Sequence, residues 1–472
     1  MARFHEWTGV SGRIGLGPVS AVVTPSLVRE ALVECGLPIG AQVPLPMEFM
    51  VNFVLGLAVF GDCSYQNVVE HLIGGFPELG CSVPNKSNLT RARRRLGAGV
   101  MRLIYRKLAA RLAADGQGGA FYRGMRLAAV DGMFLDLPES AGNRARFGGQ
   151  EQSPGHPRGL PVARVVALTE TGTRAQVAVS LGGWHDGELT LARDLASHAC
   201  GMLVIIDRLY PDVRLWQGFA GAGADLVIRA REGIAASAEQ VLPDGTYLTR
   251  MRESGYKGNT KRSVLVRVIE YRIGGGDKIR LLTSLLDPET HPAAQVAALY
   301  PERWEAESAN RQIKSFQRGD GVTLRSKDPD LVEQEIWAHL IVHTVVTRLI
   351  TTLAQTEGLD PDRISYTNTL EQVRLAVTRQ PRPTEPEQQN PDTLASRPQT
   401  PEPLTRHPFI RILATRCERL LDNGVKRMRA SKRQVSQPPT KYPQRPVTEK
   451  TKQRTYKTKP TVVTLLPTPM IT

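Results

Sequence analysis

The sequence of 472 residues predicts an α/β protein that is preceded by an all-α N-terminal domain. Two observations support this prediction. Between about residues 26 and 111, apolar residues recur at helical spacing in segments that glycine and proline separate. From about residue 125, short apolar runs typical of strands alternate with segments typical of helices, which is the pattern of a layered α/β domain.

The N-terminal part contains a strongly basic helix. The predicted helices there are 26–36, 47–60, 64–75, 87–97 and 100–114. The fourth of them can be capped by Ser87 and carries Arg91, Arg93, Arg94 and Arg95. Because four arginines this close together cannot all point into a core, we interpret the segment as a DNA-recognition helix. A solvated basic face is the alternative.

The following part reads as an α/β domain with an insertion. The predicted strands are 125–137, 162–170, 175–182, 202–210 and 224–232, and the predicted helices between them are 188–199 and 211–220. An antiparallel β-rich insertion, at about 233–282, is expected next from the strand patterns 245–253, 261–273 and 278–286. A long amphipathic helix over 330–356 is expected to pack on the sheet.

The composition divides the chain further and indicates a partner. We predict a helical domain over 1–120, a catalytic domain over 121–354, and a C-terminal segment over 355–472 with a Pro/Gln-rich linker and a disordered basic tail. The tail from 426 to 459 holds twelve Lys and Arg and one acid, 12 − 1 = +11, out of a net charge of +15. Such a balance favours a polyanionic partner, nucleic acid first. A merely solubilising tail is the alternative.

Other sequence features exclude several classes of protein. The five cysteines are scattered without a CxxC pair, which argues against a disulfide framework or a zinc site. We expect no signal peptide and no membrane span, and therefore a cytoplasmic protein. His339 and His343 lie one turn apart on the long helix, but without nearby acids this pair is weak support for a metal site.

Two aspartates follow apolar strand patterns. Asp131 lies in LAAVDGMF and Asp207 ends MLVIID. Either one alone most often caps a helix or shapes a turn, but two such residues can meet at one edge of a sheet. Glu307, on a helix packed against that sheet, could add a third carboxylate. Three carboxylates suit a hard cation, Mg²⁺ or else Mn²⁺, and two such ions can support an in-line displacement at phosphorus.

The segment YPERWEAESANRQIKSFQR supplies Glu307 together with basic residues. On a helix, Tyr300, Arg303, Glu307 and Lys314 fall within about 60° of one another. The apolar residues of the opposite face are Ala306, Ala309, Ile313 and Phe316. A surface helix with charge pairs is the alternative. Next to a metal site, Arg208, Arg303 and Lys314 would hold phosphates and Tyr300 would donate a hydrogen bond to one. Trp304 would stack on an unpaired base or pack in the core.

These motifs together resemble a known family. The spacing Tyr300-x2-Arg303-x3-Glu307-x6-Lys314 resembles the signature of the insertion-sequence-4 family of bacterial DDE transposases. The stretches VDGMFLDLPESAGNRARFG and MLVIIDRLYPDVRLW are similar to its two aspartate blocks, and the resemblance runs from about residue 20 to 350. It implies an RNase H-like catalytic core with a β-rich insertion, and Asp131, Asp207 and Glu307 as the metal-binding triad.

The sequence and the resemblance together predict a transposase. It would bind the terminal inverted repeats of its element, cut DNA with a metal-activated water, and join the exposed 3′-hydroxyl to target DNA. Its partners would be double-stranded DNA and a second copy of the chain, and it would be nucleoid-associated in the bacterial cytoplasm. A metal-dependent nuclease and an inactive DNA-binding remnant are the alternatives.

Overall fold

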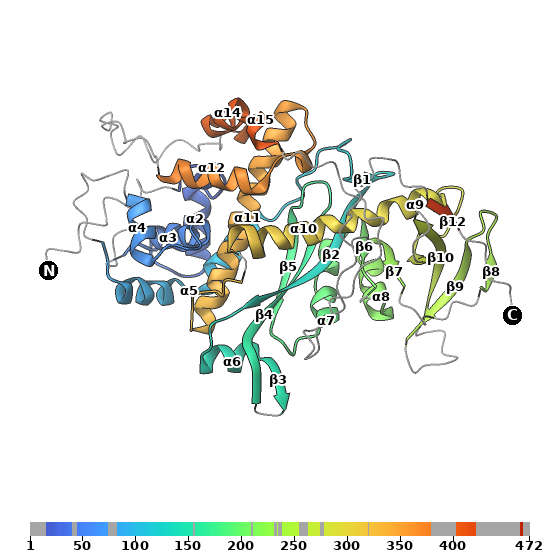
Figure 1. Ribbon diagram of the computed structural model, residues 1–472, viewed down its shortest axis with the longest axis horizontal. Coiled ribbons are helices and arrows are strands. Elements are labelled where there is room, and N and C mark those ends of the chain that lie inside the picture. Colours follow the sequence, from blue (N-terminus) through green and yellow to red (C-terminus); the bar gives the residue numbers. More distant parts are fainter. Residues whose placement is uncertain are drawn as a thin grey trace, which may run out of the picture.

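The computed structural model of the chain places the predicted elements in three dimensions (Figure 1). It describes residues 16–39, 45–73, 83–153, 156–208, 211–230, 234, 238–253, 263–273, 278–319, 321–378, 403–421 and 463–465. The predicted Pro/Gln-rich linker and the basic tail from 426 to 459 lie outside these residues.

Helices make up the N-terminal elements. They are α1 (Pro18–Val22), α2 (Pro25–Glu34), α3 (Met47–Val59), α4 (Tyr65–Ile73) and α5 (Lys86–Leu108). The cap of α5 is Asn85, whose side chain accepts a hydrogen bond from the Asn88 backbone N–H at 2.9 Å, so the prediction of Ser87 is wrong. The helices predicted over 87–97 and 100–114 form one element, α5, which kinks at Gly97, where φ is 69°. Glycine adopts this left-handed conformation at low cost.

A mixed sheet forms the centre of the molecule. Its main strands are β2 (Met125–Asp136), β4 (His156–Glu170), β5 (Gln176–Gly182), β6 (Met202–Ile206) and β7 (Asp225–Arg229). They are ordered β5-β4-β2-β6-β7, with β2, β6 and β7 parallel and with β4 and β5 antiparallel to their neighbours. All five predicted strands are therefore confirmed. Two short strands, β1 (Phe121–Tyr122) and β3 (Gly149–Ser153), pair with β2 and β4.

Helices cover both faces of this sheet (Figure 1). On one face, α7 (Glu188–Arg193) and α8 (Val213–Gly221) pack on Val130 and its same-face neighbours. On the other face, α9 (Ala293–Leu299) and α10 (Trp304–Arg311) pack on Ala129 and its neighbours. Successive side chains of a strand point to opposite faces. Asp131 therefore belongs to the face that α10 covers.

The predicted β-rich insertion continues the same sheet. It consists of β8 (Gln240–Val241), β9 (Tyr247–Arg252), β10 (Ser263–Ile273) and β11 (Ile279–Thr283). The pairing is antiparallel as predicted, and β11 also pairs with the core strand β7. The short strand β12 (Val463–Leu465), from near the C-terminus, pairs with β10. The insertion therefore extends one edge of the core sheet.

The long predicted helix is α11 (Pro329–Glu357). It shares one hydrophobic core with α2, α3 and α5 and with the ends of β2 and β4, so it lies between the N-terminal helices and the sheet. The predicted packing on the sheet is therefore found, and the packing on the N-terminal helices was not predicted. By length and apolarity α11 resembles a membrane span, but 89% of its most apolar stretch is buried inside the protein. It is the central core helix of this part of the molecule.

The two histidines of α11 are buried. His343 Nε2 is 3.0 Å from Gln312 Oε1, and Gln317 Nε2 is 3.1 Å from His339 Nδ1. Burial lowers the pKa of each imidazole to about 3. Both side chains therefore connect α11 to the segment that carries the predicted basic signature.

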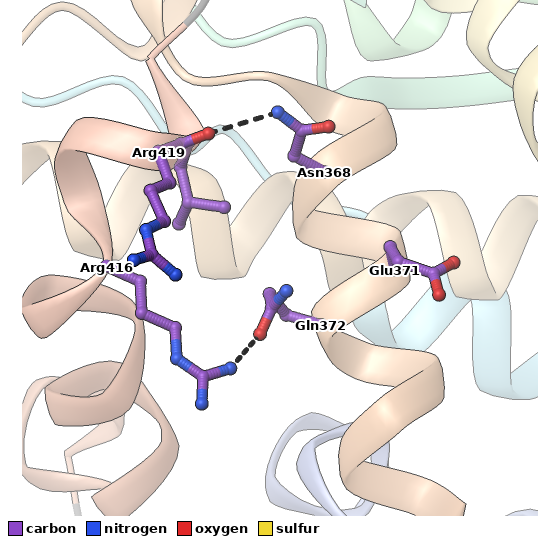
Figure 2. Close-up of a pocket in the computed structure, with 6 residues that line it drawn as sticks. Asn368, Glu371, Gln372, Arg416 and Arg419 are labelled. Atoms are coloured by element: carbon purple, nitrogen blue, oxygen red, sulfur yellow. Dashed lines mark hydrogen bonds between the residues drawn. The ribbon is translucent and has the colours of Figure 1, made fainter.

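Unpredicted helices precede and follow the linker. They are α12 (Tyr366–Thr378), α14 (Pro408–Thr415) and α15 (Cys417–Leu420). Figure 2 shows α15 beside α12, with the side chains of Arg416 and Arg419 extending into a pocket of about 320 Å³ between them. Arg416 donates to Gln372, and Asn368 donates to the Arg419 carbonyl at 3.2 Å. Residues 403–421 are thus folded onto the helical part of the chain.

Candidate active site

Asp131 and Asp207 lie side by side on neighbouring strands. In the parallel pairing of β2 with β6, Val130 is the partner of Ile206, and each aspartate is the next residue. Paired strands are about 4.8 Å apart, and residues in register point to the same face of a sheet. The two carboxylates therefore leave the sheet together, toward the face that α9 and α10 cover.

Glu307 comes from a helical run that crosses this face. The run begins with α9, continues as the 3₁₀ segment Tyr300–Arg303 and α10, and ends as a π-helix, Gln312–Gln317. Tyr300 does not cap a helix that begins at Pro301, because the backbone is already helical upstream. Proline removes one N–H from the ladder, which is consistent with the tighter 3₁₀ turn at this point.

The π-helix changes which residues face the core. Ala306, Ala309 and Ile313 are buried, as predicted. Phe316 was predicted to join them, but 41% of it is exposed and the Arg311 guanidinium lies 5.6 Å from its ring centre. A π-helix closes its hydrogen bonds over five residues rather than four. The angular positions calculated for an ideal α-helix therefore fail beyond residue 312.

The Asp131 carboxylate is held by Asn310. Asn310 Nδ2 donates to Asp131 Oδ2 at 2.9 Å, and Gln176 Nε2 donates to Asn310 Oδ1 at 3.3 Å. Burial and the nearby charge of Glu307 raise the pKa of Asp131 to about 7, although Arg303 and the Asn310 hydrogen bond oppose the shift. Asp131 and Glu307 therefore repel one another across this site, and a cation between them would be stabilised.

Arg303 is the cation that lies among these acids. Its Nη2 donates to Glu307 Oε1 at 2.6 Å, and only 3% of the residue is exposed. Burial alone would lower the pKa of Arg303, but Tyr300, Asp207 and Glu307 raise it above its usual value. Tyr300 in turn donates from its hydroxyl to Asp207 Oδ1 at 3.2 Å. The guanidinium thus binds the acid of the helix directly and interacts with the acids of the strands through its charge.

The residue types at this site suit a divalent metal, but their arrangement holds an arginine. Carboxylate oxygens are the preferred ligands of Mg²⁺ and Mn²⁺. Within the described part of the chain, no group of three or more His, Cys, Asp and Glu side chains is close enough to hold a metal ion. Arg303 Nε and Nη1 are buried without a hydrogen-bond partner among the same residues. The donor chemistry fits, whereas the ligand set is not gathered in this conformation.

The predicted DNA contacts separate into exposed and buried residues. Lys314, Arg208, Arg91 and Arg95 are exposed. Arg94 is exposed as well, and its Nε is 3.1 Å from Asp328 Oδ2. These five side chains are accessible to the phosphates of a DNA backbone.

The three predicted contacts next to Glu307 are less accessible. Tyr300 and Arg303 are buried, and they bind Asp207 and Glu307 rather than solvent. Trp304 is half-buried, and the Arg303 guanidinium lies 5.0 Å from its ring centre. A rearrangement at Arg303 would be needed before it could contact a phosphate.

The DNA-contact prediction for Arg93 is wrong. Arg93 is 0% exposed, and its guanidinium donates to Gln334 Oε1 at 2.8 Å, to Ser326 Oγ at 3.2 Å and to the Leu331 carbonyl at 3.0 Å. It also donates to the Tyr65 hydroxyl. All its nitrogens thus have acceptors inside the protein. The argument that the four arginines cannot all face a core holds for the group but not for this member.

Three residues near the site were not predicted. Asn310 and Gln176 form the hydrogen-bonded chain to Asp131, and the Glu188 carboxylate lies against the backbone of Gly132, within 2.3 Å of where a β-carbon would stand. The sequence could have indicated Asn310, because this residue lies three positions after Glu307 and therefore on the same helix face. Gln176 and Glu188 come from other elements, and no sequence pattern joins them to Asp131.

Comparison with known proteins identifies the chain. Residues 122–345 match the family described as Transposase DDE domain, and residues 13–106 match the family described as Insertion element 4 transposase N-terminal. The chain belongs to the insertion-sequence-4 family of DDE transposases. It is 28% identical over 434 residues to "Transposase InsG for insertion sequence element IS4" of Escherichia coli strain K12, covering 89% of this chain and 92% of that protein.

A solved structure is also similar to this transposase. It is the "Cryo-EM structure of piggyBac transposase synaptic complex with hairpin DNA", with a TM-score of 0.42 and 10% sequence identity over 86% of this chain and 85% of that chain. The family assignment identifies the protein as a DDE-type transposase, an enzyme that acts on DNA with a divalent metal.

Proposed function

We propose that this transposase binds the terminal inverted repeats of its element and that Asp131, Asp207 and Glu307 form its catalytic centre. One observation carries the assignment of residues. The parallel register of β2 and β6 puts both aspartates next to each other, on the face where α10 brings Glu307 close enough to raise the pKa of Asp131. These three acids come from separate parts of the sequence and share one small region.

The sheet supports an RNase H-like core. The order β5-β4-β2-β6-β7, with three parallel strands and two antiparallel ones, and with helices on both faces, is the arrangement that we expect of such a core. The insertion follows β7, the last strand of that core, and the chain then returns through α9 and α10 with Glu307. This order along the chain supports the proposal of an interrupted catalytic core.

The side chains have separable tasks in cutting DNA. Asp131, Asp207 and Glu307 would hold Mg²⁺ or Mn²⁺, and the bound ions would activate a water and stabilise charge at the phosphorus. Asn310 holds one Asp131 oxygen in place. Tyr300 orients Asp207 through its hydroxyl. The exposed Lys314 and Arg208 would bind phosphates on either side of the cut. The proposed reaction includes no covalent bond between a side chain and DNA.

The second step follows from the first. The 3′-hydroxyl that cutting exposes would attack a target phosphodiester by the same in-line displacement, which exchanges one P–O bond for another. Joining two element ends in one event requires two copies of the chain, so we propose a homodimer in the working complex. The exposed Arg91 and Arg95 on α5 would add sequence-independent attraction to DNA in the bacterial nucleoid.

A cleavage assay on end-containing duplexes tests the assignment. Each of Asp131→Ala, Asp207→Ala and Glu307→Ala should lower metal-dependent strand cleavage by more than about a thousandfold while end binding in a gel shift is retained. Glu418→Ala, a change at an exposed acid on α15, is the matched control and should cleave normally. Full cleavage by any of the three variants would remove that residue from the catalytic centre.

A second assay distinguishes transposition from hydrolysis alone. Pre-cut ends are supplied with a target plasmid, and joined products are measured. We expect wild-type protein to produce them and the Glu307→Ala variant to produce none. Cleavage without any joining would instead indicate the metal-dependent nuclease.

A further inference from the structure

The Arg303 guanidinium occupies a position at the candidate active site that a metal ion would compete for. Its Nη2 binds Glu307 at 2.6 Å, and its charge also interacts with Asp207 and Asp131. All three acids proposed as metal ligands thus face one buried protein cation. One of them, Glu307, is its direct partner, so this carboxylate oxygen is already engaged by the guanidinium in the metal-free site.

The hydrogen-bonding capacity of the Arg303 guanidinium is only partly used. Nε and Nη1 are buried and have no hydrogen-bond partner among the described residues. A buried donor without an acceptor costs free energy, typically about 1–3 kcal/mol. Arg303 is therefore held by charge rather than by a full set of hydrogen bonds. An acceptor with several oxygens, such as a phosphate, would bind it better than this site does.

Charge makes the two cations alternatives. Two positive charges a few ångströms apart repel strongly in a partly buried site, so a divalent ion between Asp131 and Glu307 would be opposed by a guanidinium that remained in place. Removing Arg303 without a replacement would leave the acids uncompensated. The site therefore favours one of two states, with either the arginine or the metal among the carboxylates.

The neighbours of Arg303 lie close to the solvent-exposed side of the helical run. The residue belongs to the 3₁₀ segment Tyr300–Arg303, next to the half-buried Trp304, over whose ring the guanidinium already lies. The exposed Lys314 lies farther along the same helical run. Arginine binds phosphate through two parallel hydrogen bonds, which the Nε and Nη1 donors would help to supply.

We propose that Arg303 is the internal counter-cation of the metal-free site, and that a DNA phosphate draws its guanidinium away so that the divalent metal can bind. Metal loading is then coupled to DNA binding, and each favours the other as linkage requires. This inference rests on the proposed function, because it takes Asp131, Asp207 and Glu307 as the metal ligands. It makes Arg303 a positioning residue rather than a permanent part of the DNA-binding surface.

The test measures Mn²⁺ binding directly, without any cleavage. The full-length wild type and Arg303→Met are titrated with Mn²⁺ by calorimetry, with and without a short mixed-sequence DNA duplex. Wild type should bind Mn²⁺ about tenfold more tightly with DNA than without it. Arg303→Met should bind about tenfold more tightly than wild type in the absence of DNA, and added DNA should then change its affinity little.

Two further variants keep the result interpretable. Arg303→Lys keeps the charge and should bind Mn²⁺ as weakly as wild type without DNA, whereas Arg303→Gln should behave like Arg303→Met. Thermal unfolding of each variant identifies any that fails to fold, and the remaining neutral variant then gives the answer. The inference is overturned if the folded neutral variants bind Mn²⁺ no more tightly than wild type in the absence of DNA.

A different result would affect the proposed function instead. Asp131→Ala and Glu307→Ala should lose the Mn²⁺ site both with and without DNA. If they bind Mn²⁺ as wild type does, the carboxylates are not the ligands and the proposed catalytic centre fails. If they lose the site but Arg303→Met resembles wild type, only the role of Arg303 is wrong.

Discussion

Two of the buried arginines in this transposase, Arg93 and Arg303, have different surroundings. Arg93, between α5 and α11, donates to the neutral acceptors Gln334, Ser326, Tyr65 and the Leu331 carbonyl, and all its nitrogens are used. Arg303, between the sheet and α10, has one acid as its direct partner and two unpaired nitrogens. The first guanidinium is fixed by hydrogen bonds and the second mainly by charge.

The difference separates a structural arginine from one placed to move. A buried group whose hydrogen bonds are all made would not be stabilised further by moving, so it holds together the elements that it bridges. A buried group with unpaired donors beside several acids gains by finding a better acceptor or by exchanging with another cation. Burial alone therefore does not distinguish the two roles, and the count of satisfied nitrogens does.

The largest expected effect is on stability at Arg93. Arg93→Met should lower the free energy of unfolding by about 3–5 kcal/mol, because buried acceptors on α4 and α11 lose their donor. Arg303→Met should lower it less, by about 1–2 kcal/mol without metal, because Glu307 loses its partner but is partly exposed and can be hydrated. Urea denaturation of metal-free protein measures both.

The matched control for this comparison is Arg95→Met, two residues along α5. Arg95 is exposed, so its replacement should change the free energy of unfolding by no more than about 0.5 kcal/mol. Equal losses for Arg93→Met and Arg303→Met would show that the number of satisfied nitrogens does not separate the two sites.

A second prediction concerns pH and Asp131. The pKa of Asp131 is raised to about 7 in the folded protein, so this group stabilises the fold at low pH, and that contribution is lost as the pH rises from about 4 through 7. Asp131→Asn does not titrate. Between pH 5 and pH 8 without metal, it should therefore gain about 2–3 kcal/mol relative to wild type. Urea denaturation at the two pH values measures this difference.

The same experiment can be repeated at the two arginines. Arg303 opposes the raised pKa of Asp131, so Arg303→Lys should preserve the wild-type pH dependence, whereas Arg303→Met should strengthen it. A conservative change at Arg93 should leave the pH dependence unaltered. Identical pH profiles for wild type and Asp131→Asn would show that Asp131 does not carry the raised pKa.

The sequence predicts the architecture better than the details of the site. The strand patterns indicate β2, β4, β5, β6 and β7 because each combines an apolar run with turn residues at its ends. The convergence of Asp131 with Asp207 follows from the rule that parallel strands end at one edge. The acids, the glutamate helix and the inserted antiparallel strands could therefore be placed without coordinates.

The remaining details depend on contacts between distant residues. Whether Arg93 or Arg95 is buried depends on α11, more than two hundred residues later in the chain, because Gln334 supplies the acceptor. The exposure of Phe316 depends on a π-helix, which an ideal period of 3.6 residues cannot represent. The partner of Asp131 depends on Asn310 and Gln176 meeting across three elements. Sequence periodicity contains none of this information.

A smaller effect is expected at Asn310. Asn310→Ala removes the hydrogen bond that orients Asp131, which should weaken Mn²⁺ binding in the presence of DNA by about three- to tenfold, or roughly 1 kcal/mol. The fold should be retained, as thermal unfolding can show. Asn310→Asp keeps the shape but places a second acid at Asp131, and should reduce the stability of the metal-free protein at pH 8 more than Asn310→Ala does. Unchanged Mn²⁺ affinity in Asn310→Ala would show that this hydrogen bond does not prepare the metal ligand.

The smallest effect on Mn²⁺ binding should appear at Lys314, the exposed member of the signature that contains Arg303. Lys314 is exposed, so it can bind a phosphate where it stands, and Lys314→Ala should weaken DNA binding by about 1 kcal/mol and reduce the salt slope of the affinity by about one. Its Mn²⁺ affinity without DNA should equal that of wild type, unlike that of Arg303→Met. Lys107→Ala is a suitable control, because Lys107 Nζ is already 2.5 Å from Glu34 Oε1. If Lys314→Ala binds Mn²⁺ more tightly than wild type, any nearby positive charge hinders metal binding. The role proposed for Arg303 would then not be specific to that residue.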